Sequence, residues 1–212
     1  MTLHLYGHPF SSYTWKALIP LYETGKSFEF CNIAGDEHPE NVAVLMGHWP
    51  LGKFPLLVDG AEAIVEASII VEHVAPQLIP SDRDAAREVR MLDRIFDNYV
   101  MNVATQVVMT AIRGGDVEAS RAEAGPALDK VYGWLDRRLA GRTWAAGDDF
   151  TLADCAGAPS LFYADWVHEI SAPFAKSRAY RARALARPSV ARCIDEARPY
   201  RHYFPLGAPD RD

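Results

Sequence analysis

The pattern of apolar residues changes near residue 76, and this change limits the folds that the chain can adopt. Before it, short apolar runs bounded by Gly, Pro and Asp alternate with segments of helical periodicity. We predict four strands, over Thr2–Tyr6, Phe28–Ile33, Leu56–Val58 and Ala63–Val65. Asp59-Gly60 stands between the last two, as an antiparallel hairpin requires. The first part of the chain is therefore expected to be a small α/β module.

After this module only helical periodicity remains. The proline-bracketed stretch Pro76-Gln77-Leu78-Ile79-Pro80 marks the change, because proline interrupts both helices and central strands. Two helical faces follow, one with Val89, Leu92, Ile95, Phe96 and Val100 and one with Leu128, Val131, Leu135 and Leu139. Ser81 or Asp82 can cap the first of these helices, and Gly114-Gly115 can end it. We expect an α/β domain over residues 1–76, a linker over 77–82 and an all-helical domain over 83–212.

Length and charge narrow the classes of function. The chain has 212 residues, 49% of them hydrophobic, which is enough for one large domain or two small ones. Its net charge is -6, and its 22 Lys and Arg residues are scattered, so nucleic acid is not an expected partner. No apolar run approaches the roughly 20 residues of a membrane span, and residues 1–6 enter a strand in place of a cleavable leader. We expect a soluble, cytoplasmic protein.

Cysteine and histidine usage points to no metal or disulfide framework. Cys31, Cys155 and Cys193 are odd in number, widely spaced and without a CxxC motif. The seven histidines include no HExxH motif. We expect the three cysteines to be small buried apolar side chains, and we expect no metal centre.

Hydroxyl side chains gather where the first strand gives way to a helix. The sequence Ser11-Ser12-Tyr13-Thr14 follows the first strand and opens a helical pattern that runs to about Glu23. The N-terminus of a helix carries unpaired N–H groups and about half a positive charge, which favour an anion such as a thiolate. The loop has no cysteine of its own.

A second helix start is specified by a capping box. In Phe150-Thr151-Leu152-Ala153-Asp154, Thr151 is the N-cap and an acid follows three residues later, so that each side chain can satisfy the backbone N–H of the other. Phe150 stands where a hydrophobic staple begins.

Taken together, these motifs resemble the glutathione S-transferase family. They are the Ser11–Lys16 loop, Pro50–Leu57, Glu66–Ile70 and the capping box, in the family's order, with the linker where the family changes domain. The resemblance covers essentially the whole chain. It implies a thioredoxin-like N-terminal domain, an all-helical C-terminal domain, glutathione as co-substrate and a homodimer. The SerSer-x-x-Trp sequence is similar to the zeta class, a serine-type, bacterial zeta-like branch.

By this resemblance Ser11 is the catalytic residue that stabilises the glutathione thiolate. Lowering a thiol pKa by two units takes roughly 2.7 kcal/mol, of which a helix N-terminus gives about 0.3 to 1 and a hydroxyl hydrogen bond about 1.5 to 3. Ser12 is the alternative, because a shift of one residue in the helix start would exchange the two. Other branches use a tyrosine whose place falls to Gly7 here, so we expect Tyr6 in the core. Tyr13 is expected to pack within the first helical turn.

The resemblance assigns the other glutathione contacts to two motifs. In the first, Pro55 is cis, Phe54 pairs with the cysteinyl unit through its main chain, and Lys53 is a candidate for the glycyl carboxylate, with His38 as a weaker one. In the second, Glu66 neutralises the γ-glutamyl ammonium and the N–H of Ala67 binds its carboxylate. Family members commonly carry serine in place of Ala67, so we expect modest affinity unless Ser68 reaches across.

The electrophile is expected between the Ser11 loop and the helical domain. We predict as walls Tyr99, Asn102, Val103, Gln106 and Met109, closed by Phe162, Trp166, Tyr203 and Phe204. Pro20 and Pro159 are expected to kink their helices.

The leading function is a detoxifying transferase that conjugates glutathione to a small electrophile. The alternatives are a zeta-like isomerase or dehalogenase of a small acid, whose anionic substrate would need a positively charged residue near Ser11 such as Arg94 or Arg113, and a non-catalytic binding protein.

Overall fold

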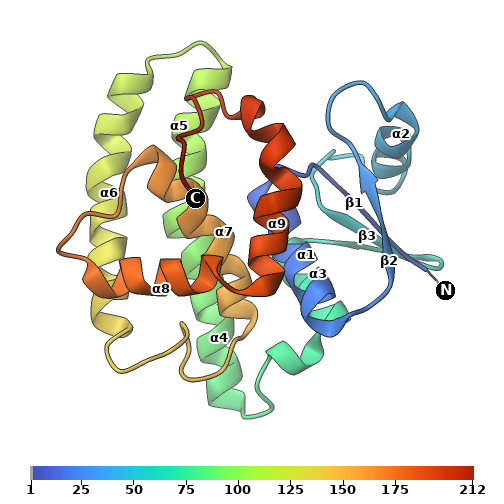
Figure 1. The fold of residues 1–212 in the computed structure, drawn as a ribbon. Coiled ribbons are helices and arrows are strands. Elements are labelled where there is room, and N and C mark those ends of the chain that lie inside the picture. The colour runs from blue at the N-terminus through green and yellow to red at the C-terminus, as the bar shows by residue number, and fades with distance from the viewer. Residues whose placement is uncertain (1) are drawn as a thin grey trace.

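The computed structural model describes residues 2–212 and begins with a four-stranded mixed sheet (Figure 1). Its strands are β1 (Leu3–Gly7), β2 (Phe28–Asn32), β3 (Leu56–Asp59) and β4 (Glu62–Val65), in the order β2-β1-β3-β4. β1 runs parallel to β2 and antiparallel to β3, and β3 and β4 form a hairpin that turns through Gly60 with φ at 60°. The four predicted strands are confirmed, and their ends differ from the prediction by one residue.

Three helices pack on this sheet, giving the thioredoxin-like arrangement. They are α1 (Ser12–Thr24), α2 (Pro39–His48) and α3 (Ala67–Val74). α2 contributes Leu45 to a small cluster with Tyr6, Cys31 and Leu56, while α1 and α3 join the main core on the other side. α1 continues through Pro20 to its end at Thr24, whose hydroxyl donates to the Pro20 carbonyl at 2.8 Å.

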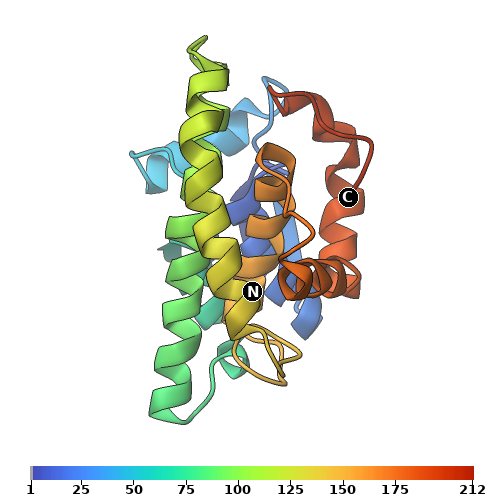
Figure 2. The ribbon, with the colours of Figure 1, turned by 90° about the vertical axis from the view of Figure 1, so that its left-hand side faces the viewer.

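The rest of the chain is helical, as predicted. Its helices are α4 (Arg83–Ile95), α5 (Asn102–Ile112), α6 (Val117–Arg138), α7 (Leu152–Val167), α8 (Ala175–Leu185) and α9 (Pro188–Ala197). Short 3-10 turns cover Pro76–Leu78 and Arg198–Tyr203. A π-helical turn, Phe96–Met101, joins α4 to α5 without a break, and α6 runs back beside this long helical rod (Figure 2).

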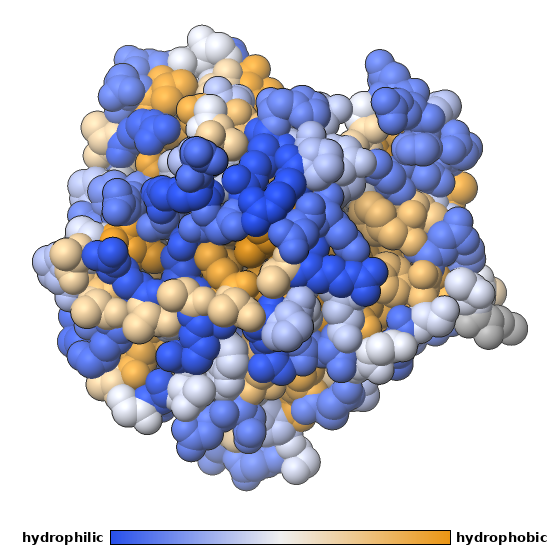
Figure 3. All heavy atoms as spheres, in the orientation of Figure 1, coloured by the Kyte–Doolittle hydropathy of each residue, from blue (hydrophilic) through white to orange (hydrophobic). Residues whose placement is uncertain are grey.

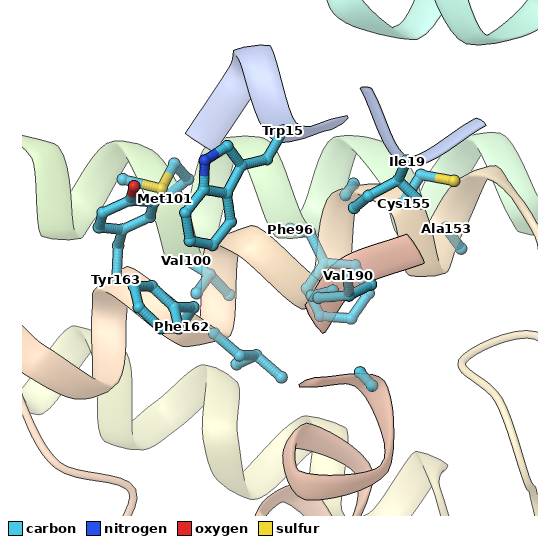
Figure 4. Close-up of a cluster of buried hydrophobic side chains, with 14 of the residues drawn as sticks. Trp15, Ile19, Phe96, Val100, Met101, Ala153, Cys155, Phe162, Tyr163 and Val190 are labelled. Atoms are coloured by element: carbon cyan, nitrogen blue, oxygen red, sulfur yellow. The ribbon is translucent and has the colours of Figure 1, made fainter. Parts of the chain in front are cut away.

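The central helix α7 connects the two parts of the molecule. All of its 16 residues are buried, and it packs on α1 of the sheet-containing part. Trp15 of α1 lies against Phe162 and Tyr163 of α7, with ring centroids 4.9 and 5.2 Å apart (Figure 4). Because Trp15 is only 1% exposed, this contact fixes α1, and with it the Ser11 loop, on the helical part.

The predicted capping box starts α7. The backbone N–H of Thr151 donates to the Asp154 carboxylate at 2.9 Å, and its hydroxyl donates at 3.2 Å. The same carboxylate accepts the Ala145 N–H at 2.9 Å and the Tyr180 hydroxyl at 2.7 Å. Asp154 is fully buried, and burial raises its pKa against the effect of these hydrogen bonds.

Polar and apolar side chains alternate over the molecular surface. In the view of Figure 3, polar side chains dominate and apolar ones gather in separate small patches. None of the helices in the described part of the chain combines the length and the apolar character that crossing a membrane requires.

Candidate functional site

Two adjoining cavities lie beside the start of α1. The larger, of about 530 Å³, lies between the β1–α1 loop and the helical part, and the smaller, of about 320 Å³, lies over the start of α3. They share Tyr13, Lys53 and Phe54 as lining residues. Ser11 and Ser12 line only the larger cavity, while Pro55, Glu66 and Ala67 line only the smaller one. All seven residues that the sequence predicted for the site therefore line this pair of cavities.

Ser11 is the N-cap of α1. Its backbone is extended, and its Oγ accepts the Thr14 N–H at 3.4 Å. Because the oxygen is the acceptor in this bond, its proton remains available to a ligand in the cavity. Ser12 is the first helical residue and is 8% exposed, whereas Ser11 is half-buried.

The strand that precedes the loop leaves no room for a side chain at residue 7. A Cβ on Gly7 would lie 2.7 Å from both Oγ1 and Cγ2 of Thr14, closer than real Cβ atoms come to their neighbours. Tyr6, as expected, is buried on the α2 side of the sheet. Residue 7 at the end of β1 therefore cannot carry a hydroxyl side chain for the cavity. Ser11, the N-cap of α1, is placed to provide one instead.

Tyr13 packs against the main core, as expected, and also makes a polar contact. Its hydroxyl donates to Oδ1 of Asn102 on α5 at 3.1 Å, at the border between the two cavities. Burial, followed by the nearby Asp97 carboxylate, raises the pKa of the Tyr13 phenol well above its ordinary value of 10. Tyr13 therefore stays protonated at neutral pH.

The Phe54–Pro55 peptide bond is cis, as the resemblance implied. The Phe54 side chain is 37% exposed, and Lys53 is exposed beside it. His38 lines neither cavity and lies 3.5 Å from Glu40 instead.

Glu66 holds an unusual backbone conformation at the start of α3. Its φ is 70°, the only positive φ of a residue other than glycine among residues 2–212. Such a conformation costs about 1 to 3 kcal/mol and is found mainly at functional sites. It turns the chain from β4 into α3, whose first N–H groups, beginning at Ala67, have no partner within the helix.

Ser68 does not replace the hydroxyl that Ala67 lacks. Its Oγ lies 2.9 Å from Lys16 Nζ and 2.9 Å from the Asp93 carboxylate, and it also contacts Arg94. The alternative in which Ser68 reaches across to a ligand has no support, because its hydroxyl is held in a polar cluster by Lys16, Asp93 and Arg94.

Sequence reasoning missed this cluster, which joins α1, α3 and α4. Lys16 Nζ is 2.5 Å from Asp93 and 2.7 Å from Asp97, and all three side chains are at most 8% exposed. Arg94 pairs with both carboxylates from the outside. Burial raises the pKa of Asp97 although the Lys16 ammonium opposes this shift. The available signal was a pair of acids four residues apart beside an apolar helix face.

The predicted walls of the larger cavity were largely wrong. Tyr203 and Phe204 do line it, but Phe162 and Trp166 lie in the core. α5 contributes Ala104, Thr105, Val108 and Ile112, and the π-helical turn contributes Met101. The predicted face, Tyr99, Asn102, Val103, Gln106 and Met109, is absent from this lining, and Tyr99 and Val103 border a groove against α6. The lining residues Met101, Ala104, Thr105 and Val108 stand two positions after the predicted Tyr99, Asn102, Val103 and Gln106, so the prediction selected the wrong face of this helix.

His8 lines the larger cavity but belongs to none of the motifs that predicted the site. Its Nδ1 accepts the Phe10 N–H at 3.0 Å, so the neutral ring carries its proton on Nε2. Burial, and then the neighbouring His202, lower the pKa of His8. The two arginines considered as cations for an acidic substrate are elsewhere: Arg94 is paired in the polar cluster, and Arg113 does not line the cavity.

Family models match both parts of the chain. The model described as glutathione S-transferase, N-terminal domain matches residues 5–77, and the one described as glutathione S-transferase, C-terminal domain matches residues 100–188. Among similar curated proteins, a glutathione S-transferase from Silene vulgaris is 28% identical, covering 89% of this chain and 95% of its own. Glutathione S-transferase F6 from Arabidopsis thaliana is 27% identical, covering 76% of this chain and 83% of its own.

Solved structures share the fold. Glutathione S-transferase I from maize, in complex with an atrazine glutathione conjugate, superposes with a TM-score of 0.80 at 21% identity, covering 94% of this chain and 99% of its own. A glutathione transferase family member from Pseudomonas fluorescens, with two glutathione molecules bound, gives a TM-score of 0.79 at 23% identity, covering 91% of this chain and 92% of its own. The expected zeta-like branch finds no support, since several of the similar curated proteins are plant glutathione S-transferases of the F series.

Proposed function

The chain belongs to the glutathione S-transferase family, and from this we propose that it conjugates glutathione to small apolar electrophiles. One observation carries the proposal most: the seven residues assigned to the site line two adjoining cavities that meet at the start of α1. The smaller cavity suits the polar tripeptide, and the larger one, lined mainly by apolar side chains, suits its partner.

In the proposed complex glutathione lies across the mouths of α1 and α3. Glu66 pairs with the γ-glutamyl ammonium, the Ala67 N–H binds the adjacent carboxylate, and the main chain of Phe54 pairs with the cysteinyl unit. Lys53 neutralises the glycyl carboxylate. The sulfur then reaches Ser11, and Ser12 borders the same space.

Ser11 activates the thiol by stabilising its ionised form. The hydroxyl donates to the sulfur while its oxygen keeps the Thr14 N–H bond, so the side chain serves the helix and the ligand at once. The anion also lies at the positive end of α1. The thiolate then attacks an electrophilic carbon, and the leaving group departs with the electron pair of the broken bond.

A zeta-like reaction on a small acid is less well supported, because Arg94 is already paired with two buried carboxylates. We further propose a homodimeric, cytoplasmic protein with a glutathione-binding domain over residues 1–76, a linker over 77–82 and a helical domain over 83–212. The matched ranges 5–77 and 100–188 agree with this division.

The test compares Ser11→Ala with Ser12→Ala as a matched control. With an aryl halide as the electrophile, we expect Ser11→Ala to lower kcat at least tenfold and to raise the pKa of bound glutathione, measured by thiolate absorbance. It should also cost about 1 kcal/mol of stability through the lost cap. Ser12→Ala should retain most activity. An unchanged rate in Ser11→Ala would refute the assigned role, and no binding of glutathione at millimolar concentration would refute the function.

A further inference from the structure

Three metal-ligating side chains project from one face of the sheet, away from both cavities. β1 and β2 run parallel, with His4 opposite Glu29 and Tyr6 opposite Cys31. Because alternate residues of a strand share a face, His4, Glu29 and Cys31 point to the same side. One nitrogen, one carboxylate oxygen and the sulfur of this group all lie within 4.8 Å of one another, and His4 Nδ1 is 3.4 Å from Glu29.

We propose that His4, Glu29 and Cys31 form a binding site for a thiophilic divalent cation, with Zn²⁺ as the best match. Imidazole nitrogen, thiolate sulfur and carboxylate oxygen are the three ligand types of protein zinc sites, whereas the sulfur disfavours Mg²⁺ and Ca²⁺. A water molecule would complete the tetrahedron. On binding, the Cys31 thiol releases its proton to solvent, and the thiolate and the Glu29 carboxylate together balance the charge of the ion.

Because the Glu29 and His4 side chains are exposed to solvent, an ion can reach the buried sulfur of Cys31 between them. Glu29 is 65% exposed, the His4 side chain is 36% exposed, and Cys31 is 6% exposed at the inner end. Tetrahedral zinc bonds of about 2.0 to 2.3 Å bring their ligand atoms to roughly 3.3 to 3.8 Å apart. Rotation of the exposed Glu29 and half-buried His4 side chains can close the observed spread to this range.

The proposed site departs from the expectation of no metal centre that was drawn from the sequence. The ligands lie on two strands that are 25 positions apart along the chain, His4 facing Glu29, so no short motif contains them. A bound ion would tie β2, an outer strand of the sheet, to β1 and would remove the Cys31 thiol from oxidation. The site is independent of glutathione binding, and its test can be made without glutathione.

The experiment titrates the protein with Co²⁺ as a spectroscopic probe and then competes with Zn²⁺. We expect one equivalent of Co²⁺ to produce a cobalt–thiolate charge-transfer band in the near ultraviolet, which Zn²⁺ abolishes with a micromolar or lower Kd. Cys31→Ser should remove the band, and His4→Gln and Glu29→Gln should each weaken binding at least tenfold.

Two variants serve as controls. Cys193→Ser removes a buried thiol elsewhere, and His73→Gln removes the imidazole of a half-exposed His73–Asp59 pair, 2.9 Å apart, that has no thiol in its group. Both should bind Co²⁺ like the wild-type protein. A band that persists in Cys31→Ser, or wild-type binding no tighter than that of His4→Gln, would overturn the proposal. His4→Gln changes a partly exposed residue, so the test stands even where Cys31→Ser disturbs folding.

Discussion

At the scale of single residues, the site is built by positions where the side chain serves two purposes. Ser11 caps α1 and faces the cavity, and Glu66 adopts a positive φ while it lines the smaller cavity. Gly7 acts by lacking a side chain, because any Cβ there would strike Thr14. At each of these positions the backbone conformation restricts which residue can stand there, in addition to any requirement of ligand binding.

Glu66 and Lys53 should contribute unequally to glutathione affinity. We expect Glu66→Gln to raise the Kd of glutathione at least tenfold, or about 1.4 kcal/mol, because it removes the only carboxylate among the lining residues of the smaller cavity. Lys53→Met should raise the Kd by threefold or less, since its exposed ammonium is screened by water. Isothermal titration calorimetry measures both, with the exposed Glu62→Gln as control. A larger effect of Lys53→Met would contradict this ranking.

Most of the candidate site could be predicted from the sequence, since the residues proposed to contact glutathione belong to short continuous motifs and line the two cavities. The parts of the site that could not be predicted depend on contacts between residues that are far apart in the sequence. The periodicity of the apolar residues does not show which face of a helix borders a cavity, and the predicted wall of α5 was wrong. Lys16 and its carboxylates meet only through tertiary packing, and His8 enters the cavity because the C-terminal segment folds over it.

At the scale of secondary-structure elements, the polar cluster of Lys16, Asp93 and Asp97 joins α1 and α3 to α4 and the π-helical turn. Two buried carboxylates flank one buried ammonium, and Ser68 connects them to the start of α3. Breaking a buried ion pair by removing one partner costs far more than the pair contributes, because the remaining charges stay buried.

We expect Lys16→Met to lower the free energy of unfolding by about 3 to 5 kcal/mol at pH 7. Urea unfolding followed by circular dichroism measures the loss, with the exposed Lys26→Met as control. The loss should shrink as the pH falls, because burial raises the pKa of Asp97 and protonation of this carboxylate relieves part of the uncompensated charge. It should also shrink when Asp97→Asn is added. A loss below 1 kcal/mol would mean that the ammonium is not required at this junction.

At the scale of the whole molecule, the sheet-containing and helical parts are held together by α7 and by a link between the end of α1 and the start of α9. Arg187 makes two hydrogen bonds to the Glu23 carboxylate, at 2.7 and 2.6 Å, and Ser189 also contacts it. Burial alone would raise the pKa of Glu23, but these hydrogen bonds hold it below its ordinary value of 4.5.

The Glu23 link should make stability depend on pH in one direction. A carboxyl group with a lowered pKa in the folded state stabilises the fold above its unfolded pKa and loses this effect as the pH falls through its folded pKa. We expect Glu23→Gln to cost about 1 to 3 kcal/mol at pH 7 and progressively less below about pH 4.5. Urea unfolding at a series of pH values, with the exposed Glu37→Gln as control, measures this difference. A cost that stays constant into acid would contradict the assignment.

The π-helical turn between α4 and α5 has an evolutionary consequence. Its first residues pack in the core of the molecule, while the helix beyond it forms one wall of the larger cavity. Deleting one codon in this turn would restore ordinary helical winding and present a different row of side chains to the electrophile, with the upstream half of the rod unchanged. A single insertion or deletion can thus alter substrate range in one step, a route to new specificity that point substitutions in the cavity do not provide.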